Sequence, residues 1–171
     1  MKVRSVKILM VSCAAVTLIV VASVHSLSPK LIWNSTNSAP TGLYRIDQRD
    51  PKLGEFALVA PGAAAADLIQ KRGYLPLDIP LVKRVSARAG DEICRENQAI
   101  LINKIHVADA LMADSLGQEL PQWRGCFTLQ SDEVFLLNNH EKSLDGRYFG
   151  ATNVNDVIGV AIPVWVKRHE K

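Results

Sequence analysis

The sequence of 171 residues is poor in aromatic side chains, which make up 6% of it, and its net charge is only +3. Proteins that bind nucleic acid through a basic surface carry a larger excess of lysine and arginine, often mixed with aromatic residues. No basic run in this sequence is interleaved with aromatic residues. We therefore expect that nucleic acid is not a partner of this protein.

Cysteine is also scarce, with three residues at positions 13, 94 and 126, and no two of them form a Cys-x-x-Cys pair. Zinc sites and thioredoxin-like redox sites usually contain such a pair. The sequence favours neither kind of site, and we expect no bound metal. Cys13 lies in an apolar segment, where a cysteine behaves as a small apolar side chain.

Long hydrophobic runs are absent except near the N-terminus, where residues 8–24 contain no charged side chain. This length is near the lower limit for crossing a bilayer, and Leu27 extends the run a little. Three basic residues precede the run. That order is typical of a segment whose N-terminus stays in the cytoplasm while the following chain is exported.

These features predict three parts: a basic cytoplasmic segment over residues 1–7, a transmembrane signal-anchor over 8–27, and an extracytoplasmic domain over 28–171. The expected location is the cytoplasmic membrane, crossed once, with the domain in the periplasm. A cleavable signal peptide is the alternative, because residues 22–24 (Ala-Ser-Val) offer a usable small-residue cleavage site.

Export of the domain makes a disulfide between Cys94 and Cys126 possible, because thiols oxidise readily outside the cytoplasm. The two residues bracket a polar, loop-like segment of the chain. Either a disulfide or two buried free thiols would fit this arrangement.

Short apolar runs separated by turn signals predict a mostly antiparallel β fold. The single expected helix is the Ala-rich segment 63–72, which Gly73 ends, and segment 109–124 is expected to be a loop. The expected strands are residues 43–47, 55–60, 79–85, 92–95, 99–103, 105–108, 133–138 and 157–166.

A candidate nucleophile lies in the stretch 34–44, Asn-Ser-Thr-Asn-Ser-Ala-Pro-Thr-Gly-Leu-Tyr. Pro40 fixes its own φ and biases Ala39 toward an extended conformation, so Ser38 is expected on a rigid, exposed bend. A serine hydroxyl is a poor nucleophile at neutral pH unless a base accepts its proton. No histidine lies near Ser38 in the sequence, so the base must come from elsewhere.

Lys83 is a candidate for that base. Strand alternation places it on one face with Leu81 and Val85, and Arg84 on the other. If the face of Lys83 points inward, desolvation favours the neutral amine, which can take a proton from Ser38. The spacing fits a solvent-facing Lys83 equally well.

Three further residues lie in the polar run after strand 133–138. Ser143 can hydrogen-bond the lysine amine and fix its direction. Asp145 and Arg147 are two residues apart and can form a structural ion pair that shapes the loop.

Together, three segments of this chain resemble the boxes of type I signal peptidases, most closely the conjugative-transfer signal peptidases of the TraF type. Residues 38–44 (Ser-Ala-Pro-Thr-Gly-Leu-Tyr) resemble the nucleophile box. Leu-Val-Lys-Arg-Val at 81–85, followed by Ala-Gly-Asp at 89–91, resembles the box of the general-base lysine, and residues 143–150 resemble the last box. The basic-then-apolar N-terminus fits as well.

The resemblance implies a signal-peptidase-like catalytic domain without a metal or organic cofactor. It implies that Ser38 is the nucleophile and Lys83 the general base, with Ser143 orienting the lysine. The backbone N–H of Ser38 and the Thr36 hydroxyl would form the oxyanion hole.

Some residues depart from the housekeeping members of that family. Ala39 follows Ser38 where those enzymes typically have methionine, and Leu-Asn-Asn-His-Glu at 137–141 replaces their polar lead into the last box. The chain is also shorter than many of them, which leaves little room for an accessory β domain. The excursion between Cys94 and Cys126 is expected of the TraF type.

These expectations describe a membrane-anchored serine endopeptidase that processes exported precursor proteins. The resemblance implies a pilin or related conjugation protein as the substrate. Two alternatives remain at this point: a general type I signal peptidase (leader peptidase), and a non-catalytic, anchored β scaffold of a secretion or pilus complex.

Overall fold

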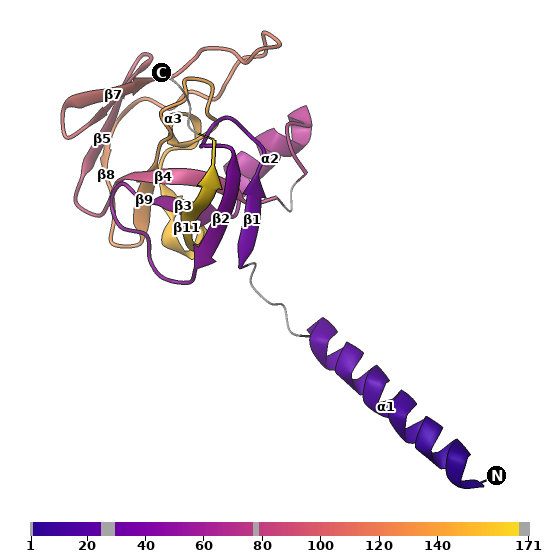
Figure 1. Cartoon of the computed structure of the whole chain (residues 1–171). Helices are drawn as coiled ribbons and strands as arrows, with labels where there is room; N and C mark the ends of the chain where they lie inside the picture. The colour runs from indigo at the N-terminus through magenta and orange to yellow at the C-terminus, as the bar shows by residue number, and fades with distance from the viewer. Residues whose placement is uncertain (1, 25–29, 77–78, 168–171) are drawn as a thin grey trace.

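The computed structural model describes residues 2–24, 30–76 and 79–167 (Figure 1). The first element is helix α1, Lys2–Val24, which stands apart from the β domain in Figure 1. Within these described residues, no helix is both long enough and apolar enough to cross a membrane. Residues 25–27 of the expected anchor lie outside the described part of the chain.

Most of the domain is one large sheet of seven strands in the order β1-β2-β11-β3-β4-β9-β10, and neighbouring strands run antiparallel. The expectation of a mostly antiparallel β fold is therefore confirmed. In chain order the strands are β1 Leu31–Asn34, β2 Gly42–Asp47, β3 Phe56–Val59, β4 Leu81–Ala87, β9 Glu133–Leu136, β10 Thr152–Asn153 and β11 Val157–Val166.

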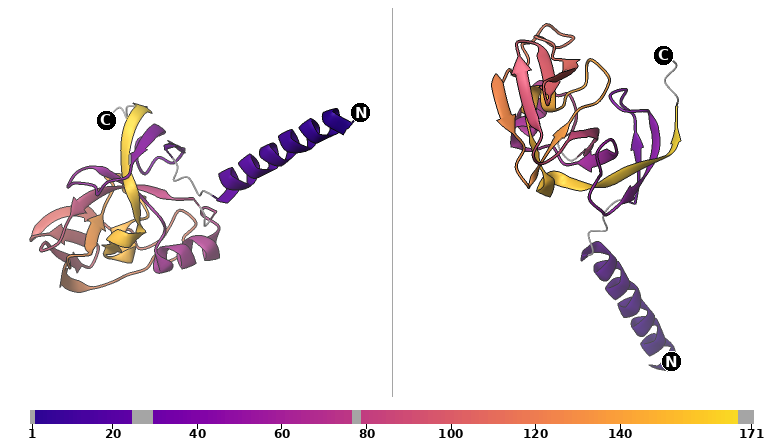
Figure 2. Two further views of the ribbon diagram at one scale, coloured as in Figure 1. Left: turned by 90° about the horizontal axis from the view of Figure 1, so that it is seen from below. Right: turned by 90° about the vertical axis from the view of Figure 1, so that its left-hand side faces the viewer.

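A second sheet of four strands has the order β7-β6-β5-β8. It lies at one end of the domain, and β1 and β2 lie at the other (Figure 2). Because this sheet forms within residues 92–128, the expectation that a short chain leaves little room for a second β unit is wrong. Its strands are β5 Glu92–Glu96, β6 Ala99–Ile102, β7 Ile105–Asp109 and β8 Gly125–Thr128.

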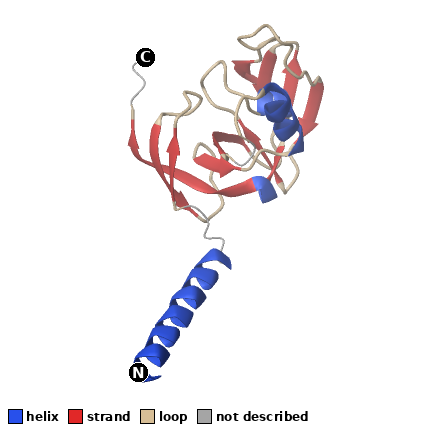
Figure 3. Ribbon diagram, turned by 90° about the vertical axis from the view of Figure 1, so that its right-hand side faces the viewer, coloured by secondary structure: helices blue, strands red, loops and turns tan. Residues whose placement is uncertain are grey.

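The expected helix is present as α2, Ala63–Arg72, and Gly73 ends it in the left-handed conformation at φ 61°. The domain also contains the single helical turn α3, Gly146–Phe149, and the 3₁₀ turn η1, Val154–Asp156, so the expectation of one helix is wrong (Figure 3). Gly146 is required for space: an added Cβ would lie 2.7 Å from the Phe135 ring and 2.8 Å from the carbonyl oxygen of Leu136.

Strand β1 was not expected, and it positions the candidate nucleophile. It is an edge strand whose Leu31 and Trp33 are exposed, so its apolar side chains do not mark a buried face. Its pairing with β2 ends with Asn34 opposite Gly42. This pair closes the loop of residues 35–41, which includes Ser38.

Both faces of β4 are covered by apolar side chains. Val82 packs in a core cluster with Tyr44 and Leu58, whereas Val85 packs in another cluster with Ala57 and Leu136. A polar side chain on this strand is therefore held away from water unless it lies at the margin of a cluster. Lys83 lies on this strand, opposite Ala57 of β3.

Candidate active site

The turn that carries Ser38 is held together by the side chain of Asn34. Its amide nitrogen donates to the carbonyl oxygens of Thr36 at 3.0 Å, Ala39 at 3.1 Å and Pro40 at 3.1 Å. Its amide oxygen accepts from the Thr36 backbone N–H at 3.3 Å and from the Thr36 hydroxyl at 2.9 Å. One buried amide thus satisfies four polar backbone groups of the turn, three carbonyls and one N–H.

The hydroxyls of Thr36 and Ser38 form a short chain with Asn34. Thr36 Oγ1 lies 3.2 Å from Ser38 Oγ. The amide oxygen of Asn34 can only accept, so Thr36 gives its proton to Asn34 and receives the proton of Ser38. For Thr36 to bind an oxyanion, its hydroxyl has to turn away from Asn34.

Lys83 points inward and is 5% exposed, which decides the alternative that the strand pattern left open. Its Nζ donates to Ser143 Oγ at 3.0 Å. Burial lowers the pKa of Lys83 from 10.5 to about 8; the charge of Asp145 opposes this shift and that of Arg147 adds to it. A substantial fraction of the amine is therefore neutral in mildly alkaline solution.

The loop that carries Ser143 is fixed by the buried guanidinium of Arg147, which is 1% exposed. Nη1 of Arg147 donates to the carbonyl oxygens of His140 at 3.0 Å and Glu141 at 2.8 Å, and Nη2 donates to the carbonyl oxygen of Asn138. These contacts satisfy a run of backbone acceptors that the sheet does not reach. They also set the path of the chain from β9 to Ser143.

Asp145 completes this arrangement from the side of α3. Its carboxylate accepts the backbone N–H of Asn138 at 3.1 Å and that of Arg147 at 3.2 Å, and lies 3.3 Å from Nε of Arg147. Burial raises the pKa of Asp145, while the charges of Arg147 and Lys83 act against that rise. The ion pair that the sequence suggested is present and shapes the loop.

Two asparagines with structural roles in the site were missed by the sequence reasoning. Asn138 accepts the backbone N–H of Arg84 at 2.9 Å and donates to the carbonyl of Val82 at 3.1 Å, so it bonds β4 on both sides of Lys83. A polar residue that directly follows an apolar strand was the available signal for Asn138. Asn34 lay inside the stretch already singled out, but its pairing with Gly42 of β2 and its hydrogen bonds to the turn were not anticipated.

Ser38 and Lys83 open onto the same cavity of about 760 Å³, which Thr36 also lines. Among the described residues, the hydrogen-bond partner of Lys83 Nζ is Ser143, and no hydrogen bond joins Nζ to Ser38. The rest of the cavity wall is largely apolar and includes Ile32, Ile69, Leu75, Leu81, Leu111 and Leu144.

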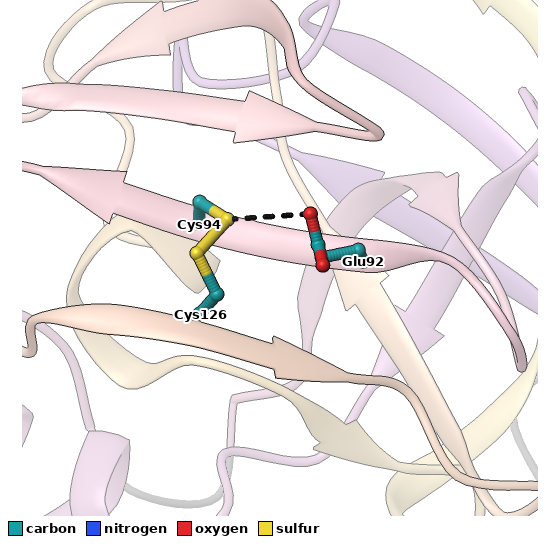
Figure 4. Close-up of side chains that lie close together, drawn as sticks. All are labelled: Glu92, Cys94 and Cys126. Carbon is teal, nitrogen blue, oxygen red and sulfur yellow. Dashed lines mark hydrogen bonds between the residues drawn. A yellow bond between two sulfur atoms is a disulfide. The ribbon is translucent and has the colours of Figure 1, made fainter.

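Cys94 and Cys126 form a disulfide between β5 and β8, in the second sheet and away from this cavity. Glu92 Oε1 lies 3.7 Å from Cys94 Sγ (Figure 4). A disulfide sulfur has no proton to donate and is not a thiolate, so this contact is neither a hydrogen bond nor the start of a metal site. Of the two arrangements that the sequence allowed, the structure has the disulfide.

Residues 2–166 match the family described as "Signal peptidase, peptidase S26", and the chain belongs to this family. Among its relatives is the plasmid transfer protein TraF of Escherichia coli, 31% identical over 142 residues, which cover 77% of this chain and 80% of the relative. A probable conjugal transfer protein TraF of Sinorhizobium fredii is 29% identical over 139 residues, covering 75% of this chain and 73% of the relative.

A solved signal peptidase I from Enterococcus faecalis is similar in structure, with 17% sequence identity and a TM-score of 0.40. The similarity covers 67% of this chain and 98% of that chain.

Proposed function

We propose that this protein is a serine endopeptidase that cuts exported precursor proteins, with Ser38 as the nucleophile and Lys83 as the general base. The observation that carries the proposal is that Ser38 and a buried lysine of lowered pKa line one cavity. A serine next to a base that is neutral near its working pH is the arrangement that acyl transfer requires.

The mechanism follows from these positions. The neutral amine of Lys83 takes the proton of Ser38 Oγ as the oxygen attacks the scissile carbonyl, and Ser143 keeps the amine aimed at the reaction. The backbone N–H of Ser38 and the hydroxyl of Thr36 stabilise the oxyanion. The ammonium of Lys83 then protonates the leaving amine, and a water activated by Lys83 hydrolyses the acyl-enzyme.

We further propose that the substrate is a pilin precursor or a related conjugation protein. The support is the family membership together with relatives that are named as plasmid or conjugal transfer proteins.

The proposed location is the cytoplasmic membrane, with residues 8–27 as the anchor and the β domain on the periplasmic side. The charge-free run behind three basic residues supports this placement. Exposed tryptophans, Trp33 at 55% and Trp165 at 60%, lie with ring centroids 5.7 Å apart and suit the interface between lipid and water. Intact-mass measurement of membrane-extracted protein tests whether residues 8–27 are retained.

One experiment tests the activity and separates the alternatives. The full chain, purified in detergent, is incubated with candidate pilin precursors and with a panel of unrelated preproteins, and product masses are measured. Cleavage restricted to a conjugation precursor supports the specialised peptidase, and cleavage of many preproteins supports the general signal peptidase.

A labelling experiment separates the peptidase from the non-catalytic scaffold. A serine-directed acylating probe should label the wild-type chain at Ser38 and fail to label a Lys83→Met variant of the same fold. Absence of both cleavage and labelling in folded wild-type protein would favour the scaffold.

A further inference from the structure

We propose that a second cavity beside Ser38 binds an acidic side chain of the substrate just after the bond that is cut. This inference rests on the proposed peptidase function and adds a specificity to it. The cavity measures about 620 Å³. It is lined by the Ser38 turn on one side and by β4, the loop after β9 and the end of β11 on the others, including Asn37, Phe56, Arg84, Asn139, His140 and Lys167.

Ser38 is the one described residue that lines both this cavity and the apolar cavity of Lys83. A peptide whose carbonyl is presented to Ser38 Oγ therefore extends into one cavity on each side of the cut. The two cavities differ in chemistry. The cavity of Lys83 contains the carboxylate of Asp114 among its lining residues, whereas the second cavity contains the cations Arg84 and Lys167 and no carboxylate.

The strand β4 supplies the key cation of each cavity. Lys83 and Arg84 are adjacent, so strand alternation sends them to opposite faces, and they line different cavities. Arg84 Cζ lies 5.0 Å from the centre of the Phe56 ring, which fixes the guanidinium by a cation–π contact. The backbone N–H of Arg84 donates to the side-chain amide oxygen of Asn138 at 2.9 Å.

The guanidinium of Arg84 is available to a ligand. Within the described part of the chain, no carboxylate forms an ion pair with Arg84, although four other lysine and arginine side chains there have such partners. Lys167 adds a second, exposed cation at the rim. A planar guanidinium that is held in place and lacks a counter-ion is suited to bind a carboxylate with paired hydrogen bonds.

The order of segments along an exported precursor decides on which side of the cut the carboxylate lies. The apolar part of a leader and its small residues precede the cleavage position. The cavity of Lys83 has the larger apolar surface and therefore takes the residues before the cut, and the cavity of Arg84 takes those that follow it. Because an extended chain advances about 3.3–3.6 Å per residue, the carboxylate belongs to one of the first few residues after the cut.

The test uses matched precursor peptides with Glu or Gln at the first, second or third position after the cut, each assayed with the full chain in detergent. A hydrogen-bonded charge pair predicts that Glu at one of these positions raises kcat/KM about 10–100-fold over Gln. The gain should appear mainly in KM, because the contact exists before and during the chemical step. Glu placed before the cut should give no such gain.

The variant Arg84→Gln should lose the preference for Glu while it still cleaves the Gln peptide, and Arg84→Lys should restore a large part of the preference. Added salt should weaken the preference in the wild type, since the cavity is open to solvent. Equal cleavage of Glu and Gln peptides by the wild type at all three positions overturns the inference. So does an Arg84→Gln variant that slows both peptides equally, because Arg84 would then be structural.

A binding measurement keeps this inference separate from the proposed function. Fluorescence anisotropy with the Ser38→Ala variant and labelled Glu and Gln peptides reports the preference without any cleavage. Tighter binding of the Glu peptide that depends on Arg84 supports the cationic cavity even if no peptide is cut. Equal binding of both peptides counts against it even if the wild type proves to be a peptidase.

Discussion

The turn of Ser38 and the shell around Lys83 are built in opposite ways. The turn is half-exposed, and its hydrogen bonds join Asn34 to residues two to six positions away. The shell is buried and combines two kinds of contact: Arg147 and Asp145 bond to residues two to nine positions away, whereas Lys83 bonds to Ser143 across 60 residues. Asn138 likewise reaches Val82 across 56 residues.

The difference fits the proposed role of each group. A nucleophile has to meet a large substrate, so it lies on a surface turn that local hydrogen bonds can hold. A lysine that acts as a base has to lose its proton easily, which burial achieves, and burial requires that every nearby polar group has a partner. The folding free energy should therefore depend more on the shell than on the turn, whereas the proposed chemistry depends on both.

The largest effects are expected at the two proposed reacting groups. Ser38→Ala removes the nucleophile, and Lys83→Arg replaces the base by a guanidinium that stays protonated. Each should lower kcat by at least about 10⁴-fold in a precursor cleavage assay, because such residues act as a unit. The matched control is Lys71→Arg on the exposed face of α2, which should cleave at the wild-type rate. Substantial cleavage by folded Lys83→Arg would remove Lys83 from the mechanism.

The next largest effect concerns stability and compares the two regions directly. Arg147→Gln leaves Asp145 without its ion-pair partner and three carbonyls without their donor, which should reduce the free energy of unfolding by about 3–5 kcal/mol. Asn34→Ala removes neutral hydrogen bonds from a half-exposed turn and should cost about 1–3 kcal/mol.

Urea unfolding of the detergent-solubilised chain, followed by tryptophan fluorescence, measures both changes. The exposed Arg45 provides the control, and Arg45→Gln should change stability by less than about 0.5 kcal/mol. If Asn34→Ala lowers the free energy of unfolding more than Arg147→Gln does, stability depends more on the turn than on the shell, contrary to the prediction.

A smaller effect is expected at Thr36, whose hydroxyl is proposed to stabilise the oxyanion. Thr36→Val keeps the shape of the side chain and removes the hydroxyl, so kcat should fall about 10²–10³-fold with little change in substrate binding. Thr36→Ser keeps the hydroxyl and should retain most activity. Steady-state kinetics on one precursor distinguishes the two variants. An unchanged kcat for Thr36→Val would mean that its bond to Asn34 is purely structural.

Local patterns in the sequence were enough to predict the elements that carry the site. The runs around 43–47, 55–60 and 79–85 correspond to β2, β3 and β4, and the segment 63–72 is α2. These segments combine apolar or Ala-rich runs with clear stop signals, so short-range information defines them.

The sequence could not predict features that depend on distant partners. Alternation alone predicted that Lys83 and Arg84 point to opposite faces of β4, but not how deeply each side chain is buried. That depends on the side-chain clusters that pack on the two faces of the strand. The role of Asn138 depends on its contact with Val82 across the sheet. Strand β8 and the turn α3 each span four residues, and neither contains an apolar run like that of β3.

The dependence of activity and stability on pH tests whether the shell desolvates Lys83. The base must be neutral, and the pKa of Lys83 is lowered to about 8 by burial, so kcat/KM should rise about tenfold per pH unit below 8 and level off above it. The free energy of unfolding should also depend on the protonation of Lys83. Between about 8 and 10.5 the unfolded chain binds the lysine proton and the folded chain does not, so the free energy of unfolding rises with pH in this window. Lys83→Met removes this rise and, because it no longer buries an ammonium, should be more stable than the wild type at pH 7. An activity profile that continues to rise up to the pKa of a free lysine would show that the shell does not desolvate Lys83 and that the proposed base is wrong.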